Sequence, residues 1–328
     1  MSRSPIDLNA TAHTGLKPFA WRGITGLVPP DWDISAVSGT PSAGYIGLDD
    51  DLARRLEVKW AKARKRGQMG PGEMLTQYIK AMRKNLEKGQ TLEVERNANV
   101  IGFDSLPDDR EAISYQWEHE DGQGLGLVWY CSTCGQVLIA QIQGSRSGFN
   151  LRTASNVLTS LKCHPTSAAQ FWAVFDFGFA CPLSFVLQRH KLQSGLLSFE
   201  FAHGSDRLYV ERLGMAETIL EHTDPTLWVP KVHWKKLRRR RMRFLETDTG
   251  SHLGWAIEGE KWRLLYLLPS PVSDWIRRVL KKDWIAGYMW VCPEANRLFI
   301  VRAEGPHSTE VASAVAESIE CHTEQDGG

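Results

Sequence analysis

The 328-residue chain carries one series of landmarks twice, in the same order and at nearly the same spacing. Trp129 and Trp290 each open a Trp-x-Cys triplet and lie 161 residues apart, while Cys163 and Cys321 each precede a histidine and lie 158 residues apart. The front ends of the two halves agree at offsets of 151 or 152: Trp21, Gly26, Pro30, Gly44 and Leu56–Val58 match Trp172, Gly178, Pro182, Gly195 and Leu208–Val210. Such a repeat predicts two copies of one domain.

The spacing also predicts where the copies begin and end. We expect a flexible N-terminal segment over 1–18, a first repeat domain over 19–166, a second over 167–322 and a tail over 323–328. The second copy has roughly nine extra residues in its middle. Each copy is long enough to bury a core of its own.

Apolar residues change their period along each copy. Leu56, Val58 and Trp60 alternate with polar residues, which is typical of an antiparallel strand with one buried face. A three- and four-residue spacing after Pro71 predicts a helix, and a second helix is expected over 151–162. Strands, helix, strands, helix is an α+β order, so we predict two tandem homologous domains, each a mostly antiparallel sheet covered by helices.

The opening of the first copy resembles the start of PsbP-like domains. The resemblance rests on Val28-Pro29-Pro30-Asp31-Trp32, then Gly44 and Leu56–Trp60. It implies an antiparallel sheet flanked by helices and a role as a binding or assembly factor, and it assigns no catalytic residue. The second copy departs from the pattern, with Leu183-Ser184-Phe185 after Pro182.

Cysteine and histidine recur at matching places in the two copies. Thiolates and imidazoles are the usual zinc ligands, so we name Cys131, Cys134, Cys163 and His164 as a candidate zinc site. The second copy has Ala295 where the first has Cys134, which leaves it three ligands at most, counting His322. Two other interpretations remain open: buried cysteines that only fill the core, which the sequence favours, and a redox Cys-x-x-Cys pair.

A basic run with aromatic neighbours distinguishes the second copy. Its members, which we predict to form a binding surface, are Trp228, Trp234, Lys235, Lys236, Arg238, Arg239, Arg240, Arg241 and Arg243. Such a surface fits an acidic protein partner, or alternatively the phosphates and bases of a nucleic acid or another anionic surface. The net charge of the whole chain is only +1, whereas dedicated nucleic-acid proteins are usually strongly basic.

Signatures of common enzyme classes do not occur in the sequence. It contains no GxGxxG, GxxxxGK[ST], HExxH or GxSxG, and no apolar stretch of membrane-spanning length. No export signal is readable at the N-terminus, so the cytoplasm is the expected location. Together these observations predict a non-catalytic binding or assembly protein with a protein partner, no obligatory cofactor and zinc as the one candidate metal.

Overall fold

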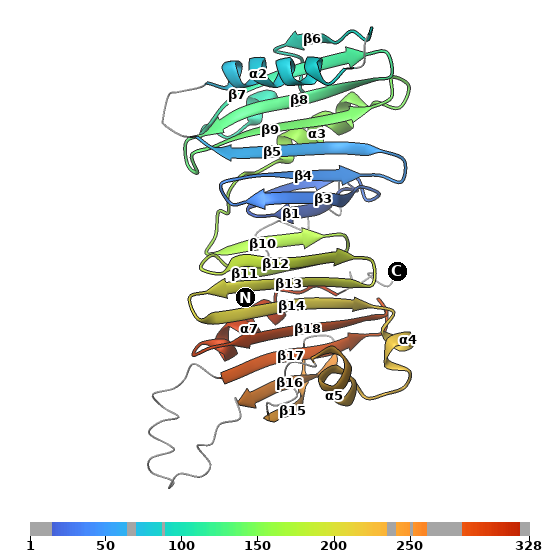
Figure 1. The fold of residues 1–328 in the computed structure, drawn as a ribbon, viewed down its shortest axis with the longest axis vertical. Helices are drawn as coiled ribbons and strands as arrows, with labels where there is room; N and C mark the ends of the chain where they lie inside the picture. Colours follow the sequence, from blue (N-terminus) through green and yellow to red (C-terminus); the bar gives the residue numbers. More distant parts are fainter. Residues whose placement is uncertain are drawn as a thin grey trace. The chain divides into compact units, whose positions relative to one another are not determined.

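Antiparallel strands make up most of the computed structural model, which describes residues 15–63, 70–86, 89–234, 241–249, 252–260 and 284–321. The chain divides into two compact units, Met1–Asp176 and Phe177–Gly328. Helices are few, so the fold is a β-rich α+β fold, as the sequence predicts in outline. Figure 1 shows the strands and helices of each unit.

The first unit is built on a seven-stranded antiparallel sheet. Its strands run in the order β3-β4-β5-β9-β8-β7-β6, and β1 pairs separately with β2 and with β10. The bounds are β1 Lys17–Trp21, β2 Ile24–Val28, β3 Asp33–Thr40, β4 Ala43–Asp49, β5 Arg54–Lys62, β6 Glu93–Arg96, β7 Arg110–His119, β8 Gly122–Cys131, β9 Gln136–Gly144 and β10 Ala169–Val174. Its helices are α2 Pro71–Lys84, the short 3₁₀ helix η1 Phe103–Ser105 and α3 Leu151–Ser160.

Local sequence sets the ends of the two main helices. Pro71 occupies the first turn of α2, and the Asn150 side chain caps α3 by accepting a hydrogen bond from the Thr153 amide. The sequence predicts that the second helix runs to residue 162, but α3 ends at Ser160. Lys162 instead exchanges backbone hydrogen bonds with Thr25 of β2, which requires an extended chain.

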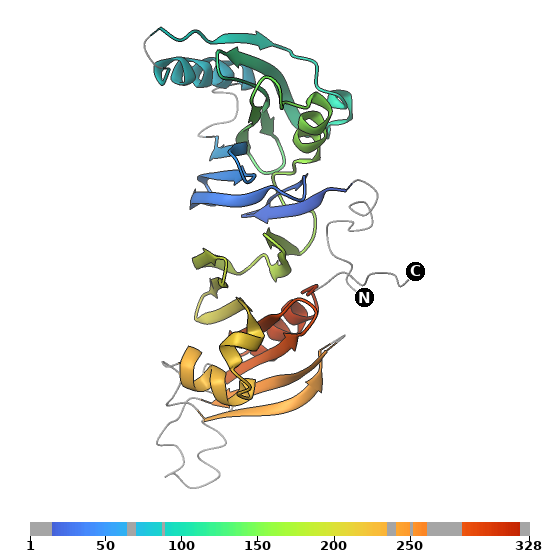
Figure 2. The ribbon, with the colours of Figure 1, turned by 90° about the vertical axis from the view of Figure 1, so that its right-hand side faces the viewer.

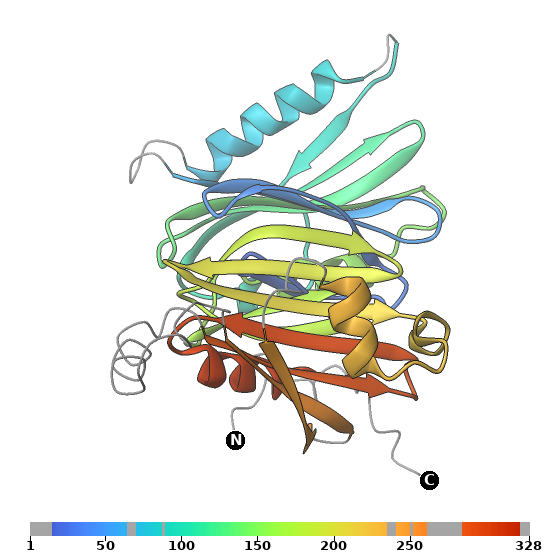
Figure 3. The ribbon, with the colours of Figure 1, turned by 60° about the horizontal axis from the view of Figure 1, so that its bottom comes forward.

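The second unit has a seven-stranded antiparallel sheet with the strand order β12-β13-β14-β18-β17-β16-β15. The bounds are β11 Phe177–Pro182, β12 Val186–Gln193, β13 Leu196–His203, β14 Asp206–Gly214, β15 Arg241–Asp248, β16 Leu253–Glu260, β17 Trp284–Cys292 and β18 Arg297–Glu304. Its helices are α4 Ala216–Leu220, α5 Pro225–Trp228, the π-helical turn η2 Val229–His233 and α7 Ser308–Ala316. Figures 2 and 3 show α7 on one side of these strands and α4 and α5 on the other.

Each sheet buries apolar side chains on both faces. In the first unit Leu56, Val58 and Trp60 point to one face, while Tyr115 and Val128 belong to the core beneath α2 on the other. Figure 2 shows α2 and α3 against opposite sides of this sheet. The predicted alternation along β5 is confirmed: Leu56, Val58 and Trp60 are buried, and the residues between them are only partly buried.

The division between the units falls after Asp176, about nine residues beyond the expected boundary near residue 167. The reason lies in β10, which follows that boundary but pairs with β1 through Ala173 and Ala20. Trp21 and Trp172, which open the two copies in the sequence, also meet edge to face with ring centroids 5.3 Å apart.

Phenylalanine packing provides a test of the second core. The Phe199 ring is fully buried and lies 5.2 Å from Phe179 and 6.3 Å from Phe177, centroid to centroid. We expect Phe199→Ala to lower the free energy of unfolding by about 3–5 kcal/mol, because it removes a large buried ring and leaves a cavity. Leu227→Ala, at a side chain that is 66% exposed, should change it by less than about 0.5 kcal/mol.

Urea denaturation, read by hydrogen exchange on peptides of the second unit, measures both effects. Equal midpoints for the two variants would contradict this description of the core.

Candidate metal centres

Two segments of the first unit bring four metal-ligating side chains together. Cys131 ends β8, and Cys134 lies in the turn that leads into β9. Cys163 and His164 follow α3, where the chain is held to β2 by the Lys162 bridge. One ligand atom from each of the four residues lies within 4.8 Å of the others. The structure thus brings together the four residues that the sequence names as a candidate zinc site.

The spacing of these atoms matches a tetrahedral zinc centre. Zn–S bonds of about 2.3 Å and Zn–N bonds of about 2.0–2.1 Å place two sulfurs about 3.8 Å apart and a sulfur and a nitrogen about 3.6 Å apart. The Sγ atoms of Cys134 and Cys163 are 3.8 Å apart. His164 Nδ1 lies 3.5 Å from Cys131 Sγ and 3.6 Å from Cys163 Sγ. Adjacent residues such as Cys163 and His164 converge here because the helix has already ended.

The electrostatics of the cluster also suit a cation. The hydrogen bond donated by the Cys163 thiol lowers the pKa of Cys134 to about 5, so one sulfur carries negative charge at neutral pH. Burial raises the pKa of Cys131, and the Cys163 pKa is raised chiefly because that thiol donates to Cys134. Asp109 Oδ2 accepts a hydrogen bond from Cys131 Sγ at 3.2 Å and lies 3.9 Å from His164 Nε2. A carboxylate beside a ligating sulfur and an imidazole adds negative charge around a bound cation.

A small cavity adjoins the ring of His164. Its volume is about 30 Å³, and its lining includes Gly23, Thr25, Lys162, His164, Pro165 and Gln170. Such a volume holds a few water molecules at most. The cluster therefore has no adjoining space for an organic substrate on this side.

A second cluster occupies the corresponding place in the second unit. Cys292 ends β17, Cys321 follows α7, and His252 lies in the turn between β15 and β16. Their ligand atoms lie within 4.8 Å of one another, with His252 Nε2 3.1 Å from Cys321 Sγ. His252 is the residue that sequence reasoning missed, since it is 69 positions from Cys321 and belongs to no motif. The predicted ligand His322 lies outside the described residues.

The basic and aromatic segment is only partly described. Lys235, Lys236, Arg238, Arg239 and Arg240 lie outside the described residues, as does the side chain of Arg241.

The described members of the segment do not form one exposed surface. Trp234 is 5% exposed and belongs to the core of the second unit, so it is no surface residue. Trp228 is half-buried and stacks on His233. Arg243 is exposed, but its neighbours Met242 and Phe244 pack against the core, so strand alternation directs Arg243 to the other face of β15.

Below η2 lies a buried charged group. His233 Nε2 donates a hydrogen bond to Glu211 Oε2 at 3.0 Å, and Ser198 Oγ donates to Glu211 Oε1 at 3.0 Å. The Arg302 guanidinium is also buried and lies 3.9 Å from the Tyr209 ring centroid. Burial alone would raise the pKa of Glu211, but His233 and Arg302 outweigh it and hold that pKa below its ordinary value.

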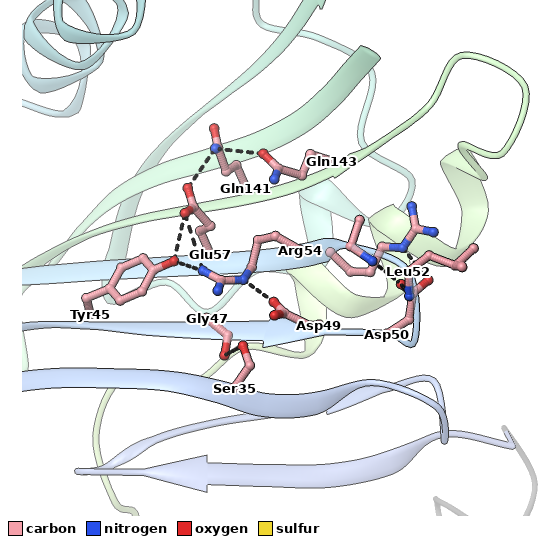
Figure 4. Close-up of polar contacts among 12 residues, drawn as sticks. Ser35, Tyr45, Gly47, Asp49, Asp50, Leu52, Arg54, Glu57, Gln141 and Gln143 are labelled. Atoms are coloured by element: carbon pink, nitrogen blue, oxygen red, sulfur yellow. Dashed lines mark hydrogen bonds and ion pairs between the residues drawn. The ribbon is translucent and has the colours of Figure 1, made fainter. Parts of the chain in front are cut away.

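A polar network covers part of the first sheet (Figure 4). Glu57 on β5 accepts hydrogen bonds from the Tyr45 hydroxyl at 2.7 Å and from Gln141 Nε2 at 3.0 Å. Arg54 bonds to Asp49 and Tyr45 and lies 3.7 Å from Glu57. Each strong donor or acceptor in this network therefore has a partner within the sheet, which is typical of a structural network.

Comparison with known proteins gives little further guidance. No protein-family model matches the chain, and no curated protein matches it. Among solved structures, the apo structure of immunity protein TplEi of T6SS from Pseudomonas aeruginosa is similar at 12% sequence identity. The match covers 93% of this chain and 97% of that chain with a TM-score of 0.32. At that score, neither fold detail nor function transfers from one chain to the other.

No helix within the described part of the chain is long and apolar enough to span a bilayer.

The buried Glu211 predicts a pH dependence of the second unit. Because its pKa is lower in the folded than in the unfolded state, ionised Glu211 stabilises the fold above its unfolded pKa of about 4.3. That contribution is lost as the pH falls through the folded pKa. We expect Glu211→Gln to cost about 3 kcal/mol at pH 7, since it removes one partner of a buried charged group.

The difference between the wild type and the Glu211→Gln variant should shrink as the pH is lowered from 6 towards 3. Urea midpoints, read by hydrogen exchange on peptides containing β14, measure it at each pH. The exposed Glu310, whose side chain is 80% exposed, gives a control variant, Glu310→Gln. A difference that stays constant over this range would overturn the assignment.

Proposed function

We propose that this chain is a non-catalytic binding or assembly protein, built of two copies of one β-rich α+β domain, whose first copy is held by a structural zinc ion. One observation carries the proposal: Cys131, Cys134, Cys163 and His164 converge with the spacing of a tetrahedral site. Zinc at this place would link the β8–β9 turn to the chain after α3.

The number of ligands supports a structural role for this ion. Four protein ligands complete the tetrahedral shell, whereas catalytic zinc keeps a position for water or substrate. The cavity beside His164, at about 30 Å³, is also too small for an organic substrate. A closed centre of this kind contributes directly to folding energy.

Gene duplication accounts for the matching order of strands in the two sheets. β3-β4-β5-β9-β8-β7-β6 and β12-β13-β14-β18-β17-β16-β15 have the same connectivity. In the first unit one cysteine ends β8 and another follows α3. In the second unit one cysteine ends β17 and another follows α7. These observations support the proposed duplication of one domain.

The exposed side chains of α5 and η2 favour a protein as the partner. Leu227 is 66% and Val232 44% exposed, and the exposed Lys231 lies between them in sequence. Exposed apolar side chains next to a cation suit a protein surface that carries apolar and acidic groups. A nucleic acid would need exposed rings for stacking, and Trp234 is buried while Trp228 already stacks on His233.

Metal analysis of the purified full-length chain tests the zinc centre. We expect Cys134→Ser to lose one zinc equivalent per chain and to lower the melting temperature, because a structural ion stabilises only the folded state. Cys181→Ser is the matched control, since Cys181 is buried and belongs to neither cluster. Unchanged zinc in Cys134→Ser, measured by mass spectrometry of the metal, would refute the proposal.

A second experiment tests the partner surface. The partner is the protein that cross-links to the wild-type chain in highest yield. The double variant Leu227→Asp with Val232→Asp should reduce its recovery at least about tenfold, because buried carboxylates at an interface core are unfavourable. Quantitative mass spectrometry after nuclease treatment measures this, with Arg243→Asp as the control on the other face of β15. Equal recovery would contradict the assignment, and recovery lost to nuclease alone would favour the nucleic-acid alternative.

A further inference from the structure

The second cluster joins three segments that are distant in sequence. His252 comes from the β15–β16 turn, Cys292 from the end of β17 and Cys321 from the chain after α7. Cys292 is fully buried, and the His252 side chain is 8% exposed. Imidazole and thiol groups at such depth need partners, and one partner of His252 is a zinc-ligand type, since His252 Nε2 lies 3.1 Å from Cys321 Sγ.

Hydrogen bonds around Cys292 hold its sulfur as a ligand would be held. The Ala295 amide donates to Cys292 Sγ at 3.4 Å. In the first unit the Cys134 amide donates to Cys131 in the same way, three residues along the chain. Amide donors fix the direction of a ligating sulfur and stabilise its negative charge. The turn after β17 therefore keeps this arrangement although Ala295 stands where the first unit has Cys134.

Glu294 is the remaining polar group at the cluster. Its Oε2 lies 3.4 Å from Cys292 Sγ and 3.9 Å from His252 Nε2, and its side chain is 58% exposed. A carboxylate at this distance can accept a hydrogen bond from a water bound to an ion. The exposed side chain of Glu294 marks the solvent side of the cluster.

We propose that His252, Cys292 and Cys321 bind a second zinc ion through three protein ligands, with a fourth position that faces solvent beside Glu294. Two thiolates and one imidazole with an open position are a donor set found in zinc sites that exchange their fourth ligand. The two copies would thus hold a closed and an open zinc centre. The open centre would take small anionic or imidazole ligands that the closed centre excludes.

An isolated cysteine–histidine pair is the alternative. His252 and Cys321 at 3.1 Å could form a hydrogen-bonded pair without metal. A zinc ion would also engage Cys292, whose sulfur lies within 4.8 Å of both of these ligand atoms. The two interpretations differ in metal content, which makes them separable.

Cobalt replaces zinc and reports coordination by its visible spectrum, so it is the probe. The full-length Cys134→Ser variant, which lacks the first centre, should bind one cobalt ion per chain with sulfur-to-cobalt charge-transfer absorption. Added imidazole or thiocyanate should shift its visible bands, because either ligand can occupy the open position. Cys321→Ser, with the first centre intact, should bind one ion whose spectrum these ligands do not change.

The controls separate this inference from the first-unit centre. His307→Gln changes a histidine whose side chain is 71% exposed and should leave two ions per chain, whereas His252→Gln should leave one. Wild-type protein provides a measurement free of folding defects: two cobalt equivalents, one of them sensitive to imidazole. One insensitive equivalent would overturn the second site alone, and one sensitive equivalent would overturn the first centre alone.

Discussion

The pairing of β5 with β9, and of β14 with β18, is the contact on which each unit depends. It joins a strand early in the unit to one near its end, from Leu56 opposite Ile142 and from Leu208 opposite Ala303. Closing so long a loop costs chain entropy, which the apolar face of these central strands must offset. Once formed, it fixes the neighbouring strands β8 and β17, and with them the cysteines at their ends.

Those strand ends explain why ligands from distant segments converge. In both units the closing helix returns over the sheet, and the chain after it passes the end of β8 or β17. A cysteine on each side of that crossing is enough to bring two sulfurs together. A metal at this crossing would link the last segment of the unit to its central strands, and its binding energy would oppose fraying of the closing helix.

Sequence reasoning succeeded where one face of an element is buried. The alternation of Leu56, Val58 and Trp60 and the capping signals of α2 have direct structural counterparts. It missed β3 and β12, edge strands whose mostly exposed side chains leave no periodic signal. The first cluster was found because spacing reveals it, but His252 was not, since a turn between two hairpin strands gives no sign of what it faces. Trp234 was misplaced because a basic neighbourhood says nothing about the burial of the ring beside it.

The two clusters also show which parts of a shared architecture can change. The strand end and the chain after the closing helix supply a cysteine in both units, because both positions follow from strand pairing. The other ligands come from turns and irregular segments: Cys134 and His164 in one unit, His252 in the other. Turns tolerate substitution because few core contacts depend on them. Under the proposed zinc binding, replacement of one turn ligand would convert a closed shell into an open one without disturbing the sheet, so one centre would serve stability while the other has an exchangeable position.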